Sequence, residues 1–374
     1  MDVLKSIEIA FRRVLLRLLG LIIKRGKSVP PGLDFNSVKI LFVRQDRIGD
    51  VLISTPLIYA LKSRYPAAVV DFLLSSNNHF VLAHEPLVRK RWVYRKSAAS
   101  ALRLIRSIRR EQYDFVIDLM DNPSTTSTLI CALAGGRWNV GLSKQNEYAY
   151  DVAVPLLSRK ETHIVDRLAV LLTVFGISPE KEKLEVRYVP AADSRRFAQT
   201  FFQQRDLRDR FVIGLNVSPA GGVRFWGIQN FRALIQRLLG QFPELPILVL
   251  YQPRDKEQAE NIAESFKRVV LSPRTDSFDQ FAALVQLIGI LVTPDTSAVH
   301  LAAAFHIPSV VLYVQSNKDL RIWEPYGSPS ETIVTDVDDL KTIPADRVFE
   351  AVSRLIAKID AGRARVLTGD GRAS

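Results

Sequence analysis

Acidic and basic side chains gather in one short stretch, Arg44-Gln45-Asp46-Arg47-Ile48-Gly49-Asp50, directly after an apolar run. In an open α/β sheet, ligands bind outside the carboxyl ends of the strands, so a charged loop at this position is a candidate site. Gly49 allows a close approach of the backbone, and Asp50 stands where a helix is expected to begin. The alternative is that Asp50 only caps this helix and that Arg44, Asp46 and Arg47 form surface ion pairs.

A second candidate lies some 250 residues later, where a buried run is followed by Pro294-Asp295-Thr296-Ser297 and an Ala-rich helical stretch. Backbone N–H groups and hydroxyls at a helix N-terminus, together with the helix dipole, form an anion site suited to a diphosphate. His300 follows Thr296 by four residues and Ser297 by three, so it shares their helix face. The alternative is a capped core helix with one satisfied histidine.

Short β-rich runs alternate with helical patterns along the chain, which predicts doubly wound parallel sheets. The expected strands are 38–43, 69–74, 91–94, 115–119, 138–142, 211–217, 247–251, 289–293 and 309–314. The expected helices are 51–64, 98–110, 124–134, 163–175, 231–242, 256–267, 277–287, 297–305 and 345–359. Two similar halves joined near residue 180 follow from this pattern. Pro56 predicts either a kink in the first helix or a second helix that Thr55 caps and that has Pro56 at its first position.

The composition fits a folded protein with an anionic partner. The 374 residues, 47% hydrophobic and 24% charged, suggest about two domains. A net charge of +12 implies nucleic acid, a membrane surface or a phosphorylated substrate. A single cysteine, Cys131, excludes an intramolecular disulfide and fits a reducing compartment.

Residues 1–30 combine an apolar pattern with an excess of positive charge. They hold seven Lys or Arg residues against two acids, and their longest uncharged run, 18–23, is far shorter than a bilayer span. We therefore expect an amphipathic basic helix at an anionic membrane surface. A signal peptide is disfavoured because Arg17 interrupts the apolar region and no small-residue cleavage site follows. A helix that packs on the body of the protein remains the alternative.

Taken together, the motifs resemble glycosyltransferase family 9, the bacterial lipopolysaccharide heptosyltransferases. The resemblance spans residues 38–355 and is carried by Arg44 to Asp50 followed by Thr55-Pro56, by Arg224-Phe225-Trp226, and by Pro294-Asp295-Thr296 with His300. It implies a GT-B fold of two Rossmann-like doubly wound halves facing a cleft. Residues 31–180 would be the acceptor-binding domain, 181–361 the nucleotide-sugar-binding domain and 362–374 a tail.

The resemblance also implies an inverting transfer of a heptose from a nucleotide diphosphate sugar, ADP-heptose in the family, to a lipid-linked core oligosaccharide of lipopolysaccharide. Asp50 would be the catalytic base, and the cleft residues Arg44, Asp46, Gly49 and Asp295 would support the site. The donor diphosphate would be held by Arg224, Thr296, Ser297 and His300, and the nucleoside by Asp255. No metal or other cofactor is expected.

A second basic cluster, residues 89–110, contains no acid, and Arg103, Arg106 and Arg110 recur at helical spacing. The family resemblance makes this face a landing site for an anionic acceptor. The N-terminal segment predicts retention in the cytoplasm, with peripheral association at the inner face of the cytoplasmic membrane. No nucleic-acid-binding motif is recognisable, so nucleic acid is not an expected partner.

Two other function classes stay open from the sequence. One is a sugar-nucleotide epimerase of GT-B architecture, and the other is a non-enzymatic binder of anionic lipid or nucleic acid. The chain also departs from the family pattern at Ser297, where glycine is common, at Gly227, where proline is usual, and at Tyr251-Gln252, which replaces a small Gly-rich turn. These changes are expected to narrow the donor pocket.

Overall fold

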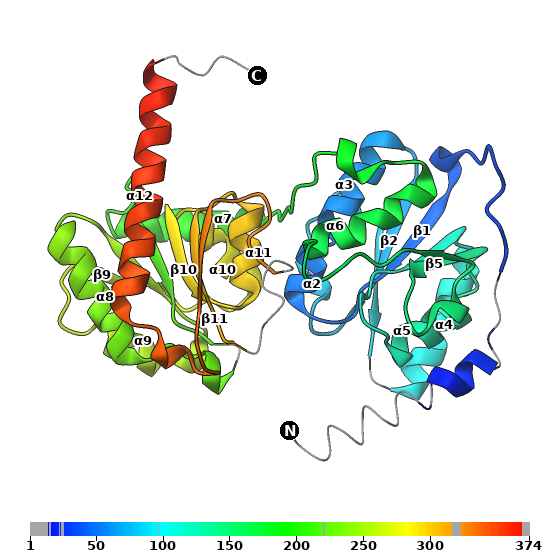
Figure 1. The fold of residues 1–374 in the computed structure, drawn as a ribbon, viewed down its shortest axis with the longest axis horizontal. Coiled ribbons are helices and arrows are strands. Elements are labelled where there is room, and N and C mark those ends of the chain that lie inside the picture. Colours follow the sequence, from blue (N-terminus) through cyan, green and yellow to red (C-terminus); the bar gives the residue numbers. More distant parts are fainter. Residues whose placement is uncertain are drawn as a thin grey trace. The chain divides into compact units, whose positions relative to one another are not determined.

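A computed structural model describes residue 14 and residues 16–21, 23, 26–95, 97–219, 221–315 and 323–368; the side chains of residues 98 and 360–368 are outside this description. The chain forms two compact units, Met1–Val186 (unit 1) and Arg187–Ser374 (unit 2). Each unit has its own parallel sheet with helices on both faces, as Figure 1 shows.

Unit 1 contains a six-stranded sheet in the order β3-β2-β1-β4-β5-β6. Its strands are β1 (Lys39–Val43), β2 (Val69–Ser75), β3 (Lys90–Tyr94), β4 (Phe115–Asp118), β5 (Trp138–Leu142) and β6 (Val152–Val154). Its helices are α2 (Ile48–Leu52), α3 (Thr55–Arg64), α4 (Ala98–Glu111), α5 (Thr125–Leu133) and α6 (Ile164–Ala169), with 3-10 turns η1 (Phe35–Ser37), η2 (His79–Leu82), η3 (Glu147–Ala149), η4 (Val170–Phe175) and η5 (Pro179–Lys181).

The central strand β1 is apolar on both faces because helices cover both sides of the sheet. It pairs in parallel with β2 on one side and with β4 on the other. Leu41 and Val43 pack with Ile108 of α4 and Ile130 of α5 in a core cluster. The covered sheet therefore delivers the end of β1, and the charged loop after it, to one edge of the unit.

Pro56 interrupts the single helix that the sequence suggested for residues 51–64. The structure has two helices: α2 begins at Ile48, and α3 follows Ser54 with Pro56 in its first turn. Pro56 has no N–H to donate, which is harmless in a first turn. A second helix is therefore present as predicted, but it begins one residue earlier: Ser54 and not Thr55 is its N-cap, and Pro56 is its second residue. The helix at the charged loop also begins earlier than expected, so Asp50 is its third residue and not its cap.

Unit 2 repeats the architecture with the sheet order β12-β11-β10-β7-β8-β9. Its strands are β7 (Ile213–Asn216), β8 (Ile247–Leu250), β9 (Val269–Leu271), β10 (Ile290–Pro294), β11 (Ser309–Tyr313) and β12 (Ser330–Val334). Its helices are α7 (Ala192–Gln204), α8 (Ile228–Gln241), α9 (Lys256–Ala263), α10 (Phe278–Val285), α11 (Ser297–Ala304) and α12 (Ala345–Thr368), with 3-10 turns η6 (Gly222–Arg224), η7 (Pro253–Asp255) and η9 (Leu340–Thr342).

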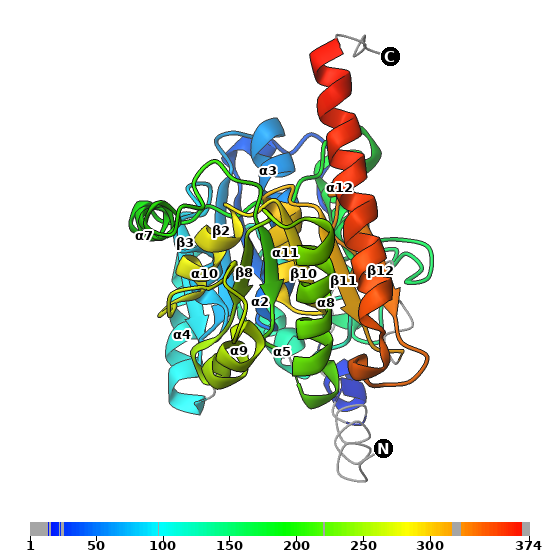
Figure 2. The same cartoon turned by 90° about the vertical axis from the view of Figure 1, so that its left-hand side faces the viewer.

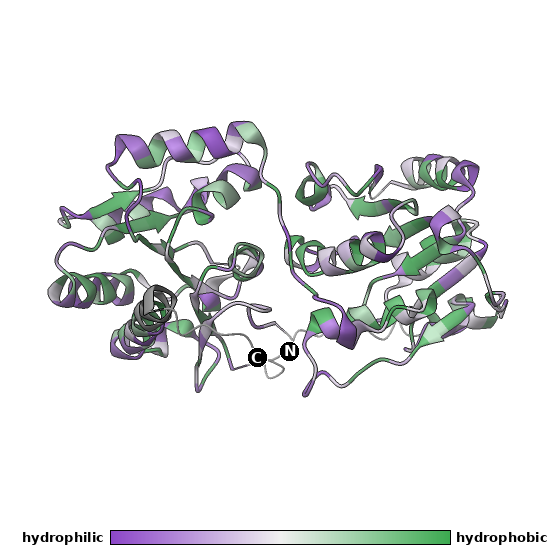
Figure 3. Cartoon of the chain, turned by 90° about the horizontal axis from the view of Figure 1, so that it is seen from above, coloured by the Kyte–Doolittle hydropathy of each residue, from purple (hydrophilic) through white to green (hydrophobic). Residues whose placement is uncertain are grey.

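The two layers of helices in unit 2 are easiest to see in Figure 2, where α8, α9 and α12 lie in front of one sheet face. Trp226, Phe231 and Val348 belong to the large apolar cluster under these helices. Apolar residues concentrate on the strands and the inner helix faces, as Figure 3 shows. The expected pair of doubly wound parallel sheets is confirmed.

The two sheets have the same topology when read from one edge: β3-β2-β1-β4-β5-β6 corresponds to β9-β8-β7-β10-β11-β12. The strand order reverses between β1 and β4 in unit 1 and between β7 and β10 in unit 2. Loops diverge at such a switch point and leave room for a ligand at the carboxyl ends of the strands. Both motifs singled out in the sequence follow strands at these switch points.

Several elements were not expected from the sequence. The edge strands β6, β9 and β12 and the helix α7 are present, and α7 begins inside the stretch 178–194 that was interpreted as a linker. Helix α12 continues to Thr368, into the segment 362–374 that was expected to be a tail. In Figure 1 its last turns run past the rest of unit 2.

Candidate functional site

Arg44 is the centre of the candidate site in unit 1. Its side chain is fully buried at the end of β1. Its Nε donates to the Asp50 carbonyl at 3.0 Å, and its Nη1 donates to the Leu119 carbonyl just beyond β4. The guanidinium therefore ties together the two loops that diverge at the switch point. Burial lowers the pKa of Arg44, but four surrounding carboxylates raise it above its ordinary value, so it stays a cation.

Asp50 is held from both sides in the first turn of α2. Its Oδ1 lies 3.2 Å from Arg44 Nη2, and its Oδ2 accepts from the backbone N–H of Arg47 at 3.2 Å. The carboxylate belongs to a capping box as its third helical residue, with Arg47 and not Asp50 as the N-cap, and it also contacts a buried guanidinium. Its side chain is largely buried and keeps 11% of its surface exposed.

Asp46 brings a second carboxylate to the same guanidinium. Its Oδ1 lies 3.2 Å from Arg44 Nε, and the side chain is 23% exposed. Burial raises the pKa of Asp46 to about 7, against the opposing effect of Arg44 and with a further contribution from Asp50. One cation is thus shared by two carboxylates in the loop that follows β1. Gly49 lies between them in the sequence, as the second residue of α2.

Further charged groups lie near this loop on β4, on the segments after β4, β5 and β6, and on α6, and none of them was predicted from the sequence. Asp118, the buried last residue of β4, pairs with Lys144 at 3.2 Å and accepts from the Tyr150 hydroxyl. Asp121 lies within 3.8 Å of the guanidinium groups of Arg159 and Arg167. An acid at the end of an apolar strand, as in 115–119, was the available signal. These acids and cations meet at the same carboxyl edge as Asp50.

In unit 2, the switch point is lined by hydroxyl and amide groups. Thr296 is the N-cap of α11, and its Oγ1 accepts from the Ala298 N–H at 3.3 Å. Asn216, the last residue of β7, donates to Thr293 Oγ1 at 2.9 Å and to Thr296 Oγ1 at 3.3 Å. Asn216 was not predicted; its signal was a polar residue inside the apolar run 211–217.

Arg224 lies beside the same helix N-terminus. It contacts Asp295 through both the carboxylate, at 3.3 Å, and the carbonyl oxygen, at 3.4 Å. Its side chain is 27% exposed. Ser297 is the first residue of α11, and His300 is buried in the next turn with its ring 6.3 Å from that of Trp323. The structure therefore brings Arg224, Asp295, Thr296, Ser297 and His300 into one region of unit 2.

Asp255 ends the turn η7 after β8 and precedes helix α9. It is almost fully buried and lies 3.6 Å from Arg254. This loop contacts the loop after β7, because the Gln252 N–H donates to Ser218 Oγ at 2.7 Å. Tyr251 belongs to the hydrophobic core of unit 2, so it supports the loop from beneath. Gly227 has φ +99°, a conformation that proline cannot adopt.

The basic residues Arg103, Arg106 and Arg110 lie on α4. Arg103 and Arg106 are exposed, and Arg110 is exposed near the C-terminal end of the helix. The neighbouring Glu111 pairs with Lys90 at the start of β3, which places this end of α4 at the amino edge of the sheet. Their proposed contact with an acceptor stays a prediction.

The described part of the N-terminal segment has two different faces. Residues 16–21 are helical; Leu16 is buried, and its carbonyl accepts from the Tyr148 hydroxyl at 2.6 Å. Val14, Leu18 and Leu21 are 53–75% exposed and recur at helical spacing. The predicted amphipathic helix extends over residues 1–13, 15, 22, 24 and 25 as well, which lie outside the described residues. No described helix is both long and apolar enough to cross a bilayer.

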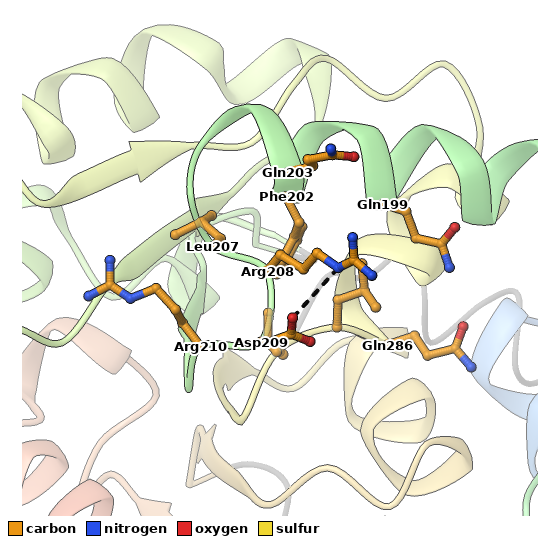
Figure 4. A pocket seen from close by; sticks show the side chains of 10 residues that line it. Gln199, Phe202, Gln203, Leu207, Arg208, Asp209, Arg210 and Gln286 are labelled. Carbon is orange, nitrogen blue, oxygen red and sulfur yellow. Dashed lines mark ion pairs between the residues drawn. The ribbon is translucent and has the colours of Figure 1, made fainter.

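A surface pocket in unit 2 lies at the other edge of its sheet. It is lined by residues of α7 and of the loops that precede β7 and β10, including Gln203, Arg208, Arg210 and Gln286 (Figure 4). The amino ends of the strands are not where doubly wound sheets bind their ligands. This pocket is therefore separate from the region around Thr296.

Residues 101–350 match the model of glycosyltransferase family 9 (heptosyltransferase). The chain is 24% identical over 348 residues to lipopolysaccharide heptosyltransferase 3 of Escherichia coli, covering 84% of this chain and 98% of the relative.

Solved structures show the same architecture. A glycosyl transferase family 9 protein from Veillonella parvula has a TM-score of 0.75 at 18% identity, covering 87% of this chain and 99% of that one. E. coli heptosyltransferase WaaC with ADP has a TM-score of 0.69 at 18% identity, covering 84% and 99%. These likenesses confirm the GT-B fold that the sequence motifs suggested.

Proposed function

Because this chain belongs to glycosyltransferase family 9, we propose that it transfers a heptose from ADP-heptose to a lipid-linked core oligosaccharide of lipopolysaccharide, with inversion at the anomeric carbon. Glycosyltransferase activity follows from membership of the family. The donor and acceptor are proposed because relatives carry the name lipopolysaccharide heptosyltransferase and a structural neighbour contains ADP. The match to a glycosyltransferase family does not favour the alternative of a sugar-nucleotide epimerase. The same match does not favour a non-enzymatic binder of lipid or nucleic acid.

The proposed base is Asp50. Inverting transfer needs a group that takes the proton of the acceptor hydroxyl as its oxygen attacks the anomeric carbon. Asp50 is fixed by Arg44 and by the Arg47 N–H, yet it remains partly exposed at the carboxyl edge of unit 1. This fixed and accessible carboxylate at a switch point is the observation on which the proposal rests.

The proposed diphosphate site lies in unit 2. As the bond from the anomeric carbon to the phosphate oxygen breaks, negative charge develops on the departing nucleoside diphosphate. Arg224 offers a planar fork, and the N-terminus of α11 at Thr296 and Ser297 offers backbone and hydroxyl donors. We propose that His300 adds a contact and that Asp255 binds the nucleoside. The catalytic step requires this region and Asp50 to meet at one substrate.

The decisive test is a transfer assay with ADP-heptose and heptose-deficient core lipopolysaccharide. Asp50→Asn keeps the shape of the side chain but removes the base, so kcat should fall about 10³-fold while the affinity for ADP is retained. Asp193→Asn, at an exposed ion pair on α7, is the matched control and should keep full activity. Consumption of ADP-heptose without acceptor, or full activity of Asp50→Asn, contradicts the proposal.

We further propose that the N-terminal helix rests on the inner face of the cytoplasmic membrane, where the acceptor lipid resides. Its exposed apolar stripe, Val14, Leu18 and Leu21, and the excess of Lys and Arg in residues 1–30 match an interfacial helix on an anionic leaflet. The basic face of α4, with Arg103, Arg106 and Arg110, would then receive the anionic acceptor.

Co-sedimentation with vesicles tests this placement. The Leu18→Glu and Leu21→Glu double variant should lose most binding to vesicles containing phosphatidylglycerol, because two charges would enter the apolar face. Leu102→Glu, at a 58% exposed leucine on α4, is the matched control and should bind as the wild type does. Loss of binding in the control alone would assign the membrane contact to α4 instead.

A further inference from the structure

Arg44 and Asp50 form an ion pair, and this creates a problem for a base. The carboxylate of Asp50 and the guanidinium of Arg44 together carry no net charge. If Asp50 takes up a proton, the two groups carry a net charge of +1, because the guanidinium keeps its own proton. Proton uptake by Asp50 beside Arg44 alone would thus leave an uncompensated buried positive charge. A second negative charge on the same guanidinium removes this obstacle.

Asp46 is placed to supply that charge. Its Oδ1 faces Arg44 Nε at 3.2 Å, while Asp50 Oδ1 faces Nη2 of the same group at 3.2 Å. Asp46 Oδ1 is buried, and within the described part of the chain it accepts no hydrogen bond. The three side chains therefore carry a net charge of −1 when both carboxylates are ionised, and they become neutral when one proton is added.

We propose that Asp46 and Asp50 act as one proton-accepting pair on Arg44, in which Asp50 contacts the acceptor hydroxyl and Asp46 is a positioning residue that raises the proton affinity of the pair. This inference rests on the proposed function. In the transfer step the hydroxyl O–H bond breaks and its proton goes to the pair. The oxygen forms the new bond to the anomeric carbon, and the old bond to phosphate breaks, its electron pair leaving with the nucleoside diphosphate.

The surroundings of the pair support this assignment. The other acids near Arg44 already have cations of their own: Asp118 pairs with Lys144, and Asp121 lies close to Arg159 and Arg167. The backbone N–H of Arg47 holds Asp50 Oδ2. The pKa of Asp46 is raised by burial and by Asp50. This is the direction expected for two neighbouring carboxylates that share one cation, because each disfavours the ionised form of the other.

The pH dependence of kcat/KM tests the proposal. The wild type should show an acid limb near neutral pH. In Asp46→Asn this limb should move at least about one unit lower, and kcat at pH 8 should fall about tenfold with KM for both substrates unchanged, because the remaining site is a weaker base. Asp46→Glu restores the charge and should restore the limb. A loss of kcat without movement of the limb indicates a merely structural role and overturns the proposal.

The outcomes separate this inference from the proposed function. If the wild type transfers heptose and Asp50→Asn does not, but Asp46→Asn has the pH profile of the wild type, the paired base is wrong and the transferase stands. Carbon-13 NMR of Asp-labelled protein adds a readout without turnover. The signals assigned through Asp46→Asn and Asp50→Asn should titrate as a coupled pair, and independent titrations overturn the proposal even if no transfer is observed.

Discussion

The switch points of the two units share a topology but differ in chemistry. In unit 1, a buried guanidinium at the end of β1 reaches across to the loop after β4 and holds two carboxylates. In unit 2, the amide of Asn216 at the end of β7 reaches across to the hydroxyls of Thr293 and Thr296 at β10. The donor of one bridge is a charged guanidinium and that of the other is a neutral amide, although each bridge joins the same pair of positions in its sheet.

The difference suggests a division of labour that suits transfer between two substrates. Ionised groups that keep each other in place can exchange a proton with a neutral hydroxyl. A neutral frame around a helix N-terminus presents donors to an anion that arrives with its own charge. Topology alone therefore fixes where each site lies, and the few polar residues at the strand ends decide what each site can do.

Substitution of Arg224, the cation near the hydrogen bonds of Asn216, should have the largest effect among the tests of this comparison. Arg224→Ala removes a charge-assisted contact and should lower kcat/KM for the donor about 100-fold. Arg224→Lys keeps the charge without the planar fork and should recover part of the loss. Donor-dependent kinetics of both variants provide the measurement. A shift of the acid limb in Arg224→Ala would place proton chemistry in unit 2 and break the comparison.

A smaller effect should follow from the neutral bridge itself. Thr296→Val keeps the size of the side chain but removes the hydroxyl that caps α11 and accepts from Asn216, so kcat/KM for the donor should fall roughly fivefold to tenfold. Thr332→Val, at a hydroxyl on strand β12 far along the sheet, is the control. Calorimetric titration with ADP should show the same difference, and equal affinities in the two variants would remove Thr296 from the site.

The smallest effect concerns stability and pH. Because the folded pKa of Asp46, about 7, exceeds the ordinary value near 3.8, the ionised carboxylate costs stability above pH 7, and the cost disappears as the pH falls toward 4. Asp46→Asn should therefore raise the melting temperature of unit 1 at pH 8, on the order of 2–4 °C, and leave it unchanged near pH 4. Melting curves at the two pH values check this, and a lower melting temperature at pH 8 would mean that Asp46 is a net stabilising ion-pair partner.

The sequence predicted the central strands well because both faces of a middle parallel strand are covered, and this requires continuous apolar runs such as 38–43 and 289–293. The edge strands β6, β9 and β12 were not predicted, because they are short or only partly buried and their sequences therefore show only a weak apolar pattern. Helix α7 was not predicted, because Pro190 and the charged stretch before it suggested a linker.

The candidate site was predicted in part. Asp50 and Thr296 could be named because each stands in a polar stretch that follows an apolar strand, and Arg224 because Arg224-Phe225-Trp226 is one of the motifs that carry the family resemblance. Asn216 and Lys144 could not, since their contacts join strands and loops that are far apart in the sequence and depend on the register of β7 with β10 and on the fold of the loop after β5. The sharing of one guanidinium by two carboxylates likewise depends on the early start of α2.

The bond from the Tyr148 hydroxyl to the Leu16 carbonyl fastens the N-terminal helix to the unit that carries Asp50. Together with the buried side chain of Leu16, this bond would couple the orientation of a helix resting on a lipid surface to the orientation of unit 1. The enzyme would then keep a restricted orientation on the membrane and meet its lipid-linked acceptor by lateral diffusion in two dimensions. The water-soluble donor would reach it by diffusion in three dimensions. Cutting the tether with Tyr148→Phe would leave the chemistry intact and make encounters with the acceptor less frequent.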